Sequence, residues 1–286
     1  MNPFDPPKFI ECHVENQLDS FSHARKLRSF IFRGHRISTW SLTSSFEREF
    51  NKYPKSQMLE GAEQYSIDYF RKRAHLYELG VNNSSMLPDV LSCMQHYGCP
   101  TRLIDFTESY YVATYFAVND PNSESENYSI WAINLPILKF KAQEMAASYF
   151  GCQENDPSIQ LNELVYKLLA IKPPGVVPVE AQSISRRMSS QRGVLLAQTN
   201  MQNSFINNLC SMVGIETTPE QVSFEDFCKV NQNIINNVVL IKFSFGGRYI
   251  QQVRRELLSL NVTSENLFPD LSGLAKSAVE HLFWQY

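Results

Sequence analysis

The sequence lacks several features that would assign it to a class of protein at once. Its six cysteines are scattered, with no C-x-x-C pair and no compact cluster with histidine, which argues against a zinc site and a disulfide framework. No window approaches 18 apolar residues, and the first residues carry proline and acid where a signal peptide needs a basic and then an apolar run. We therefore expect no metal, no membrane span and a cytoplasmic protein.

An excess of charge of one sign is lacking as well. The 26 Lys and Arg residues nearly balance 29 Asp and Glu, for a net charge of −3. The chain thus has no global attraction to nucleic acid or anionic membrane, and any such contact needs a local patch. Aromatic residues are plentiful, with 19 Phe and 13 Tyr, and they are expected to dominate a large core.

Patterns typical of helices and strands are mixed along the chain, without a repeat or a convincing linker. Apolar, β-branched and aromatic runs predict strands at 29–34, 39–45 (or a strand-like loop), 129–134, 194–197 and 238–245. Helical spacing predicts helices at 18–29, 46–50, 58–79, 88–97, 108–119, 159–169, 249–260 and 271–286. The economical interpretation is a single α+β domain over residues 1–286.

A charged residue stands at the end of the first predicted strand. Arg33 follows the apolar run Phe-Ile-Phe and precedes Gly34. One interpretation is a paired, partly exposed arginine at a strand terminus. The other is an anion clamp, because the guanidinium fork fits phosphate and glycine lets a ligand approach the backbone.

The densest polar segment spans residues 95–107, which we treat as a loop. Its seven polar-capable side chains in thirteen residues are Gln95, His96, Tyr97, Thr101, Arg102, Asp105 and Thr107. Capping of the next helix by Asp105 or Thr107 would explain part of this pattern. The combination of an imidazole, a guanidinium and a carboxylate is more typical of a functional site.

A third polar segment, 186–193, is basic and rich in serine. It is either a solvated loop with helix-like character or a phosphate-recognition element that uses Arg186 or Arg187. In the second case it also presents Gln191 at the edge of the following strand.

Taken in order, these segments resemble the FRG-domain family. The matching motifs are F-R-G at 32–34, W-S-L-T-S-S-F-E-R at 40–48, H-Y-G-C-P-T-R-L-I-D-F-T at 96–107, A-T-Y-F-A at 113–117, R-M-S-S-Q-R-G-V at 187–194 and L-F-P-D-L-S-G at 267–273. The resemblance spans roughly residues 20–275 and leaves a short N-terminal extension. FRG domains occur in bacterial and phage-associated proteins, some of them in toxin–antitoxin or anti-phage settings, so the resemblance implies a role in defence.

The aromatic strand ending in Arg-Gly is also similar to the first NAD-binding strand of ADP-ribosyltransferases. There the glycine backbone holds the nicotinamide amide and the arginine contacts phosphate or ribose. This resemblance implies a mixed, split sheet surrounded by helices, with NAD as substrate and no metal. The NAD-binding residues that it implies are Arg33, Gly34, Thr101, Arg102 and Thr107.

The same resemblance implies a toxin that transfers ADP-ribose to a macromolecule. The candidate catalytic residues are Arg33, His96, Asp105 and Gln191. Gly193 stands where these enzymes carry their catalytic glutamate, so the carboxylate would come from Asp105 first or Glu180 second, with His96 as a base or ribose ligand.

The expected acceptor is a nucleic acid, possibly RNA and otherwise DNA, although protein acceptors fit nearly as well. Tyr97 could stack on a base, and Arg187 and Arg192 could bind the acceptor. An antitoxin protein is a further expected partner.

Two other functions stay open. The missing glutamate favours a non-catalytic nucleotide-binding or sensor module of a defence system. A hydrolase that uses His96 and Asp105 ranks last, because the chain lacks the carboxylate cluster that a two-metal site needs.

Overall fold

The computed structural model describes residues 8–52, 59–77, 85–120, 127–151, 161–180 and 185–285. Its strands are β1 (Lys8–Val14), β2 (Phe30–His35), β3 (Leu103–Thr107), β4 (Tyr128–Asn134), β5 (Val176–Val179), β6 (Gly193–Gln198), β7 (Glu220–Ser223) and β8 (Val238–Phe245). Within these ranges they form one open sheet of eight strands in the order β5-β6-β3-β2-β4-β8-β1-β7. Strand β1 runs parallel to β8 and β7, and the other neighbours are antiparallel. The protein therefore has a mixed α/β fold around a mixed sheet.

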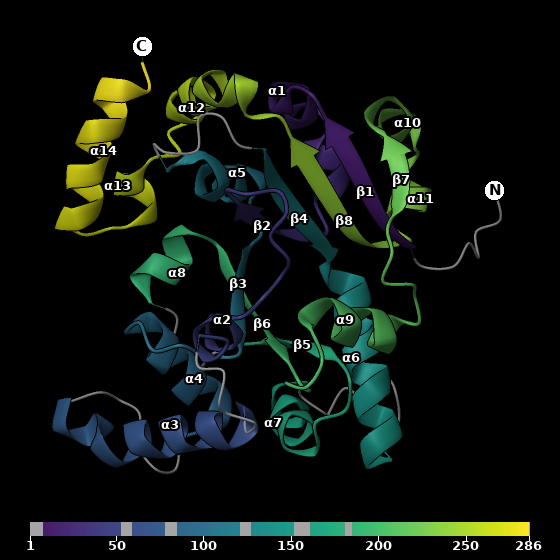
Figure 1. Cartoon of the computed structure of the whole chain (residues 1–286), viewed down its shortest axis with the longest axis vertical. Coiled ribbons are helices and arrows are strands. Elements are labelled where there is room, and N and C mark those ends of the chain that lie inside the picture. The colour runs from purple at the N-terminus through teal and green to yellow at the C-terminus, as the bar shows by residue number, and fades with distance from the viewer. Residues whose placement is uncertain are drawn as a thin grey trace.

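Helices cover both faces of this sheet (Figure 1). The α-helices are α1 (Gln17–Phe21), α2 (Ser45–Phe50), α3 (Leu59–Ala74), α4 (Leu87–His96), α5 (Tyr110–Val118), α6 (Leu135–Phe150), α7 (Leu161–Ile171), α8 (Arg186–Ser190), α9 (Phe205–Val213), α10 (Phe224–Lys229), α11 (Gln232–Ile235), α12 (Ile250–Ser259), α13 (Ser264–Leu267) and α14 (Leu271–Phe283). The 3-10 helices η1 (Ala24–Leu27), η2 (His75–Tyr77) and η4 (Gly247–Tyr249) complete the described elements. Strand β4, in the centre, is buried at every position.

Strand register places three buried clusters around the sheet. On one face, Phe32 of β2 packs with Tyr110 of α5. Phe32 is paired with Thr107, so alternation puts Leu103 of β3 on that same face, where it packs with residues of α3, α4 and α7. The opposite face carries the third cluster, in which Ile31 packs with residues of α6 and α9. One face thus has two separate helical covers, and the polar end of β3 lies between them.

Among the neighbouring strands of the sheet, β2 and β3 share the shortest stretch of pairing. These strands pair at a single position, Phe32 with Thr107, whereas β2 and β4 pair at six. The sheet therefore consists of a smaller part, β5-β6-β3, and a larger part, β2-β4-β8-β1-β7, joined by a short contact. In Figure 1 these parts form the lower and upper regions of the molecule.

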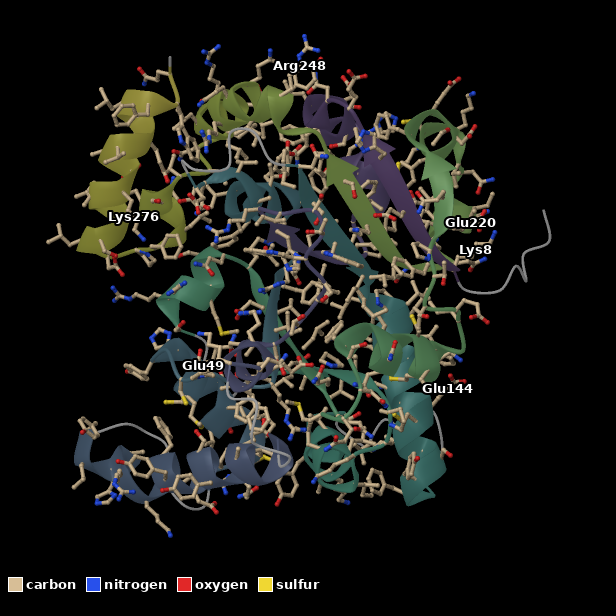
Figure 2. The ribbon with its side chains drawn as sticks, in the orientation of Figure 1. Lys8, Glu49, Glu144, Glu220, Arg248 and Lys276 are labelled. Carbon is tan, nitrogen blue, oxygen red and sulfur yellow. The ribbon has the colours of Figure 1, made fainter. Side chains whose placement is uncertain are left out.

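The far edge of the larger part is polar. Most of β7 is exposed, and Lys8 of β1 forms an ion pair of 3.2 Å with Glu220 of β7 at this edge (Figure 2). Charged and short edge strands are a common means by which proteins discourage edge-to-edge association. This polar edge therefore discourages the pairing of β7 with a further strand.

Most predicted elements are confirmed where the structure describes them. The strands at 29–34, 129–134, 194–197 and 238–245 correspond to β2, β4, β6 and β8, and the helices at 46–50, 88–97 and 108–119 to α2, α4 and α5. The helix predicted at 18–29 is divided into α1 and η1, and those at 249–260 and 271–286 correspond to α12 and α14. The helices at 58–79 and 159–169 correspond to α3 and α7. Residues 58, 78–79, 159–160 and 286 of the predicted helices lie outside the described residues.

The structure corrects the loop expected at 95–107 and decides between the alternatives left open elsewhere. At 39–45 the strand is not formed and the loop alternative holds: Leu42 is buried, and Ser44 accepts the capping-box hydrogen bond of α2. The 95–107 segment is not a loop throughout, because its second half is β3. Helix α5 is capped by Ser109 rather than by Asp105 or Thr107. The 186–193 segment is mostly the helix α8, with Gln191 as its C-cap.

Candidate functional site

A cavity of about 330 Å³ lies where β2 and β3 diverge. Its walls come from β2 and β3, from α4 and α5 on the two helical covers, and from α8 with the start of β6. Arg33, His96, Asp105 and Gln191, the four candidate catalytic residues, all line it. The structure therefore brings together side chains that are up to 158 positions apart, from residue 33 to residue 191.

Arg33 joins the two diverging strands through its side chain. Its Nη1 donates a hydrogen bond of 2.7 Å to the main-chain carbonyl of Asp105 on β3. Its Nε donates to Nε2 of His35, two residues along β2, at 3.1 Å. Within the described residues its Nη2 makes no hydrogen bond. The guanidinium is thus fixed on one side and keeps donors for a ligand on the other.

His35 fixes this orientation because it is neutral. An imidazole nitrogen that accepts a hydrogen bond carries no proton, so the proton must lie on Nδ1, which is 3.3 Å from the carbonyl of Trp40. Burial, and next the charge of Arg33, lower the pKa of His35 to about 3. Burial also lowers the pKa of Arg33, and the carboxylate of Asp105 opposes this effect. The guanidinium stays charged, since arginine does not lose its proton in proteins.

The carboxylate of Asp105 is oriented by a chain of hydrogen bonds. Gln95 donates from Nε2 to Oδ1 of Asp105 at 2.7 Å, and Thr101 donates from Oγ1 to Oε1 of Gln95 at 2.5 Å. Among the described residues that line the cavity, Asp105 is the only one with a carboxylate. His96, at the end of α4, lines the cavity beside this chain.

The wall formed by α8 is tied to the C-terminal part of the chain. Thr107 Oγ1 donates to the carbonyl of Gln191 at 2.6 Å. The side-chain amide of Gln191 donates to the carbonyl of Leu267 in α13 at 3.1 Å. The guanidinium of Arg187 lies 4.7 Å from the ring centre of Phe268, a cation–π geometry. The late L-F-P-D motif therefore supports the cavity from behind α8.

A model of the FRG domain matches residues 28–126. The chain carries an FRG domain. The match includes β2, α4, β3 and α5, and with them Arg33, Gly34 and the 95–107 segment. No curated protein and no solved structure matches the chain. The remaining wall, α8 with its support from α13, lies outside the matched part of the FRG domain.

The glycine of the FRG motif has a packing role that the sequence analysis did not anticipate. A Cβ on Gly34 would lie 1.9 Å from the carbonyl oxygen of Ala113 and 2.9 Å from the nitrogen of Ala117. Both are main-chain atoms of α5, which packs directly on β2. Gly34 also lines the cavity, but close contact between helix and strand already requires a residue without a side chain there.

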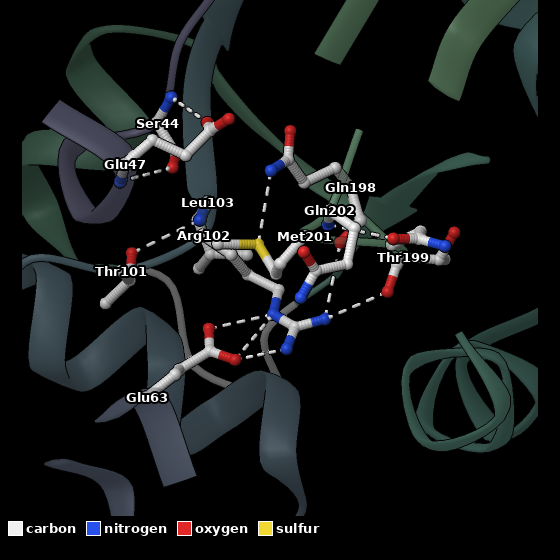
Figure 3. Close-up of polar contacts among 11 residues, drawn as sticks. Ser44, Glu47, Glu63, Thr101, Arg102, Leu103, Gln198, Thr199, Met201 and Gln202 are labelled. Carbon is white, nitrogen blue, oxygen red and sulfur yellow. Dashed lines mark hydrogen bonds and ion pairs between the residues drawn. The ribbon is translucent and has the colours of Figure 1, made fainter. Parts of the chain in front are cut away.

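Arg102 and Thr101, two of the expected NAD ligands, do not line this cavity. Arg102 donates from Nε to Glu63 of α3 at 2.8 and 3.0 Å and forms an ion pair with it through Nη2. Its Nη1 lies 3.3 Å from the carbonyls of Gln198 and Thr199 (Figure 3). Both charged side chains are about 95% buried. This arginine of the FRG domain joins α3 to β6, and Thr101 acts on the cavity only through Gln95.

Of the three expected acceptor residues, Arg187 lines the cavity, whereas Tyr97 and Arg192 follow residues that line it. Tyr97, next to His96, is 63% exposed. Arg192 is exposed and forms an ion pair of 3.0 Å with Glu108. The alternative carboxylate, Glu180, pairs with Lys139 at 3.2 Å and is not part of the cavity wall. The described residues contain no group of three His, Cys, Asp or Glu that could hold a metal, and none of the described helices has the length and hydropathy to cross a membrane.

Sequence reasoning missed two residues that position the motif arginines. His35 is two residues after Arg33 on one strand, and strand periodicity alone places the two side chains on the same face. Glu63 is an acidic residue on the buried side of an amphipathic helix, where a charge requires a partner. The first signal was available in the sequence, whereas the pairing of Glu63 with Arg102 depends on the tertiary fold.

Proposed function

We propose that this FRG-domain protein is an NAD-dependent ADP-ribosyltransferase that modifies a macromolecule. One observation carries the proposal: Arg33 is held by His35 and by the carbonyl of Asp105, so that its remaining donors face a cavity that contains a carboxylate. A fixed guanidinium suits a phosphate, and the carboxylate suits the positive charge that develops on ribose. The divergence of β2 and β3 at this point supports the split sheet that the resemblance implies.

The proposed reaction breaks the glycosidic bond between ribose and nicotinamide. Nicotinamide leaves with the bonding electron pair and becomes neutral, and positive charge spreads over the ribose ring. Asp105, oriented by Gln95, stabilises this charge. A nucleophile of the acceptor then forms the new bond to ribose, and His96 accepts its proton. Gln191 orients the ribose or the acceptor.

The acceptor that we propose is a nucleic acid, with RNA preferred. The exposed ring of Tyr97 and the guanidinium of Arg187 support this choice, because single strands bind through base stacking and cationic contacts to phosphate. As a toxin or effector of anti-phage defence, such an enzyme would act in the cytoplasm and be held in check by an antitoxin protein. This part of the proposal rests on the family resemblance.

A second candidate is a non-catalytic nucleotide-binding or sensor module. It is favoured by one observation: Asp105 already accepts a hydrogen bond from Gln95, and the described cavity wall holds no glutamate. In this case the cavity binds NAD or ADP-ribose without consuming it.

Incubation of the purified protein with NAD labelled in the adenosine part tests the first proposal. Total RNA, DNA and bacterial lysate serve as separate acceptors, and mass analysis identifies any ADP-ribose adduct. We expect transfer to RNA by the wild type and its loss in Arg33→Ala and His96→Ala. Parallel induction of wild type and Arg33→Ala in bacteria tests the toxic role, since only the wild type is expected to slow growth.

Thermal unfolding in the presence of NAD, ADP-ribose and other nucleotides separates the two candidates. A ligand that binds only the folded state raises the melting temperature. A rise with NAD but no labelled product in any acceptor supports the sensor module. Absence of both transfer and stabilisation contradicts both candidates.

A further inference from the structure

Arg33 also lines a second cavity, of about 190 Å³. Gln95 and Asp105 belong to the walls of both cavities, so the two spaces share one wall. The second cavity adds residues from α2 and the segment before it, above all Arg48. The proposed function makes no use of this cavity.

Arg48 is held at the second cavity by a rigid local structure. Ser44 and Glu47 form a complete capping box at the start of α2. The main-chain nitrogen of Phe46 and the hydroxyl of Ser45 both donate to the carbonyl of Thr101, at 3.1 and 3.2 Å. Helix α2 is therefore fixed to the residues that lead into β3, and Arg48 keeps its place relative to Asp105.

Most N–H donors of the Arg48 guanidinium make no hydrogen bond to the described residues. Its Nη1 donates to the carbonyl of Thr43, and within the described residues this is its one hydrogen bond. Its positive charge lowers the pKa of Arg33, after the larger effect of burial. Two guanidinium groups thus line one small cavity, and the carboxylate of Asp105 is the only one among the described residues of its wall. An anion bound between them would relieve this repulsion.

We propose that the two cavities form one bipartite site that binds the diphosphate group of a diphosphate ester between Arg33, which lines both cavities, and Arg48, which lines the smaller one. The two organic parts of the ester occupy one cavity each, and the larger takes the part that reacts near Asp105. That the ester is NAD rests on the proposed function. The diphosphate contact itself does not, because it follows from the two arginines and can be measured without turnover.

Inorganic pyrophosphate is the probe for this site. Isothermal titration of wild type and Arg48→Gln with pyrophosphate measures the contribution of Arg48, and inorganic phosphate shows whether a single phosphate suffices. Arg248→Gln is the matched control, because Arg248 is exposed on η4 at the top of the view in Figure 2 and is remote from both cavities. It makes the same change in net charge.

We expect Arg48→Gln to weaken pyrophosphate binding by about tenfold or more, which is typical of a lost charge-assisted hydrogen bond. Arg248→Gln is expected to stay within about twofold of wild type. Arg48→Lys keeps the charge without the fork and should fall between them. Because Arg48 is exposed, unchanged melting temperatures are expected for both Arg48 variants, and the lysine variant decides the matter if the glutamine variant is unstable.

Equal pyrophosphate affinity in Arg48→Gln and Arg248→Gln overturns the inference, as does tighter binding of phosphate than of pyrophosphate. Failure of the proposed function appears differently. If NAD yields no product while Arg48→Gln selectively loses pyrophosphate, the diphosphate site stands and the transferase proposal falls. If NAD is consumed and the affinity for pyrophosphate is independent of Arg48, the reverse holds.

Discussion

Two arginines of the FRG-domain motifs, Arg33 and Arg102, occupy contrasting environments. Arg102 lies in a buried network with Glu63 and two main-chain carbonyls. Arg33 has two fixed hydrogen bonds and faces a cavity with the rest of its donors. Both are charged residues beside apolar strands in the sequence. The difference teaches that the motif alone does not single out a candidate functional arginine, whereas unused hydrogen-bonding capacity at a cavity does.

The strongest test of the comparison removes Arg102. Arg102→Ala leaves Glu63 as an unpaired buried charge, which typically costs about 3–5 kcal/mol. Urea denaturation should show a loss of this size in the free energy of unfolding. The double variant Arg102→Met with Glu63→Leu should recover most of it, because an apolar pair can replace a buried ion pair. A loss below about 1 kcal/mol in the single variant would contradict a structural role.

Replacement of Arg33 should affect the rate of transfer strongly and the free energy of unfolding only weakly. Arg33→Gln is expected to lower the rate of ADP-ribosyl transfer on the order of 10²–10³-fold, as for loss of one preorganised charge-stabilising donor. Its unfolding free energy should fall by only about 1–2 kcal/mol, for the hydrogen bonds to His35 and Asp105. Labelled-NAD transfer and urea denaturation measure the two effects, with Arg248→Gln as the control. If Arg33→Gln lost as much unfolding free energy as Arg102→Ala, the two arginines would not differ in their structural role.

The neutral state of His35 predicts a pH dependence that sharpens the comparison. The folded pKa of about 3 lies below the ordinary value of 6.5, so the unfolded chain binds the additional proton between these values. The stability that the neutral His35 contributes to the folded state is fully present above about pH 6.5 and is lost as pH falls toward 3. Between pH 7 and pH 5 the wild type should lose about 2 kcal/mol relative to His35→Gln. Denaturation of both proteins at both pH values checks this, and parallel profiles would show that His35 is not held neutral.

The smallest effect is expected at Thr101, which is adjacent to Arg102 in sequence and yet linked to the cavity. Thr101→Val removes the donor to Gln95 and keeps the shape, so stability should fall by about 1 kcal/mol. Because Gln95 orients Asp105, the rate of NAD transfer should fall as well. An unchanged rate with reduced stability would show that Thr101, like Arg102, stabilises the fold without affecting the cavity.

The parts of the fold that depend on local pattern could be predicted from the sequence. The run Phe-Ile-Phe before Arg33 is apolar enough to indicate a buried strand, and the apolar helix α5 is bounded by clear polar residues. Strand β3 is missed although Asp105 and Thr107 alternate with apolar residues, because the polar side chains that dominate residues 95–107 indicate a loop. Its exposed residue, Asp105, lines the cavity, so the polar residues that favour a loop include part of the candidate site.

The pairings within the site could not be predicted, because each depends on contacts between distant segments. Glu63 and Arg102 are 39 positions apart, and Gln191 reaches Leu267 across 76. Such contacts follow from the order of strands in the sheet, which a single sequence does not specify. For Gly34, the need for a small residue could be predicted from the sequence, but its cause, the main chain of α5, could not.

The narrow contact between β2 and β3 has a thermodynamic consequence. One backbone pair joins these strands, and the hydrogen bond from Arg33 to the carbonyl of Asp105 reinforces them. Any anion that engages the same guanidinium must alter the strength of that reinforcement, and linkage makes the effect reciprocal. Binding of a ligand in the cavity should therefore change the hydrogen-exchange protection of the amides of β3 and β6. Ligand binding could then be detected from the exchange of the sheet's own amides, without a label on the ligand.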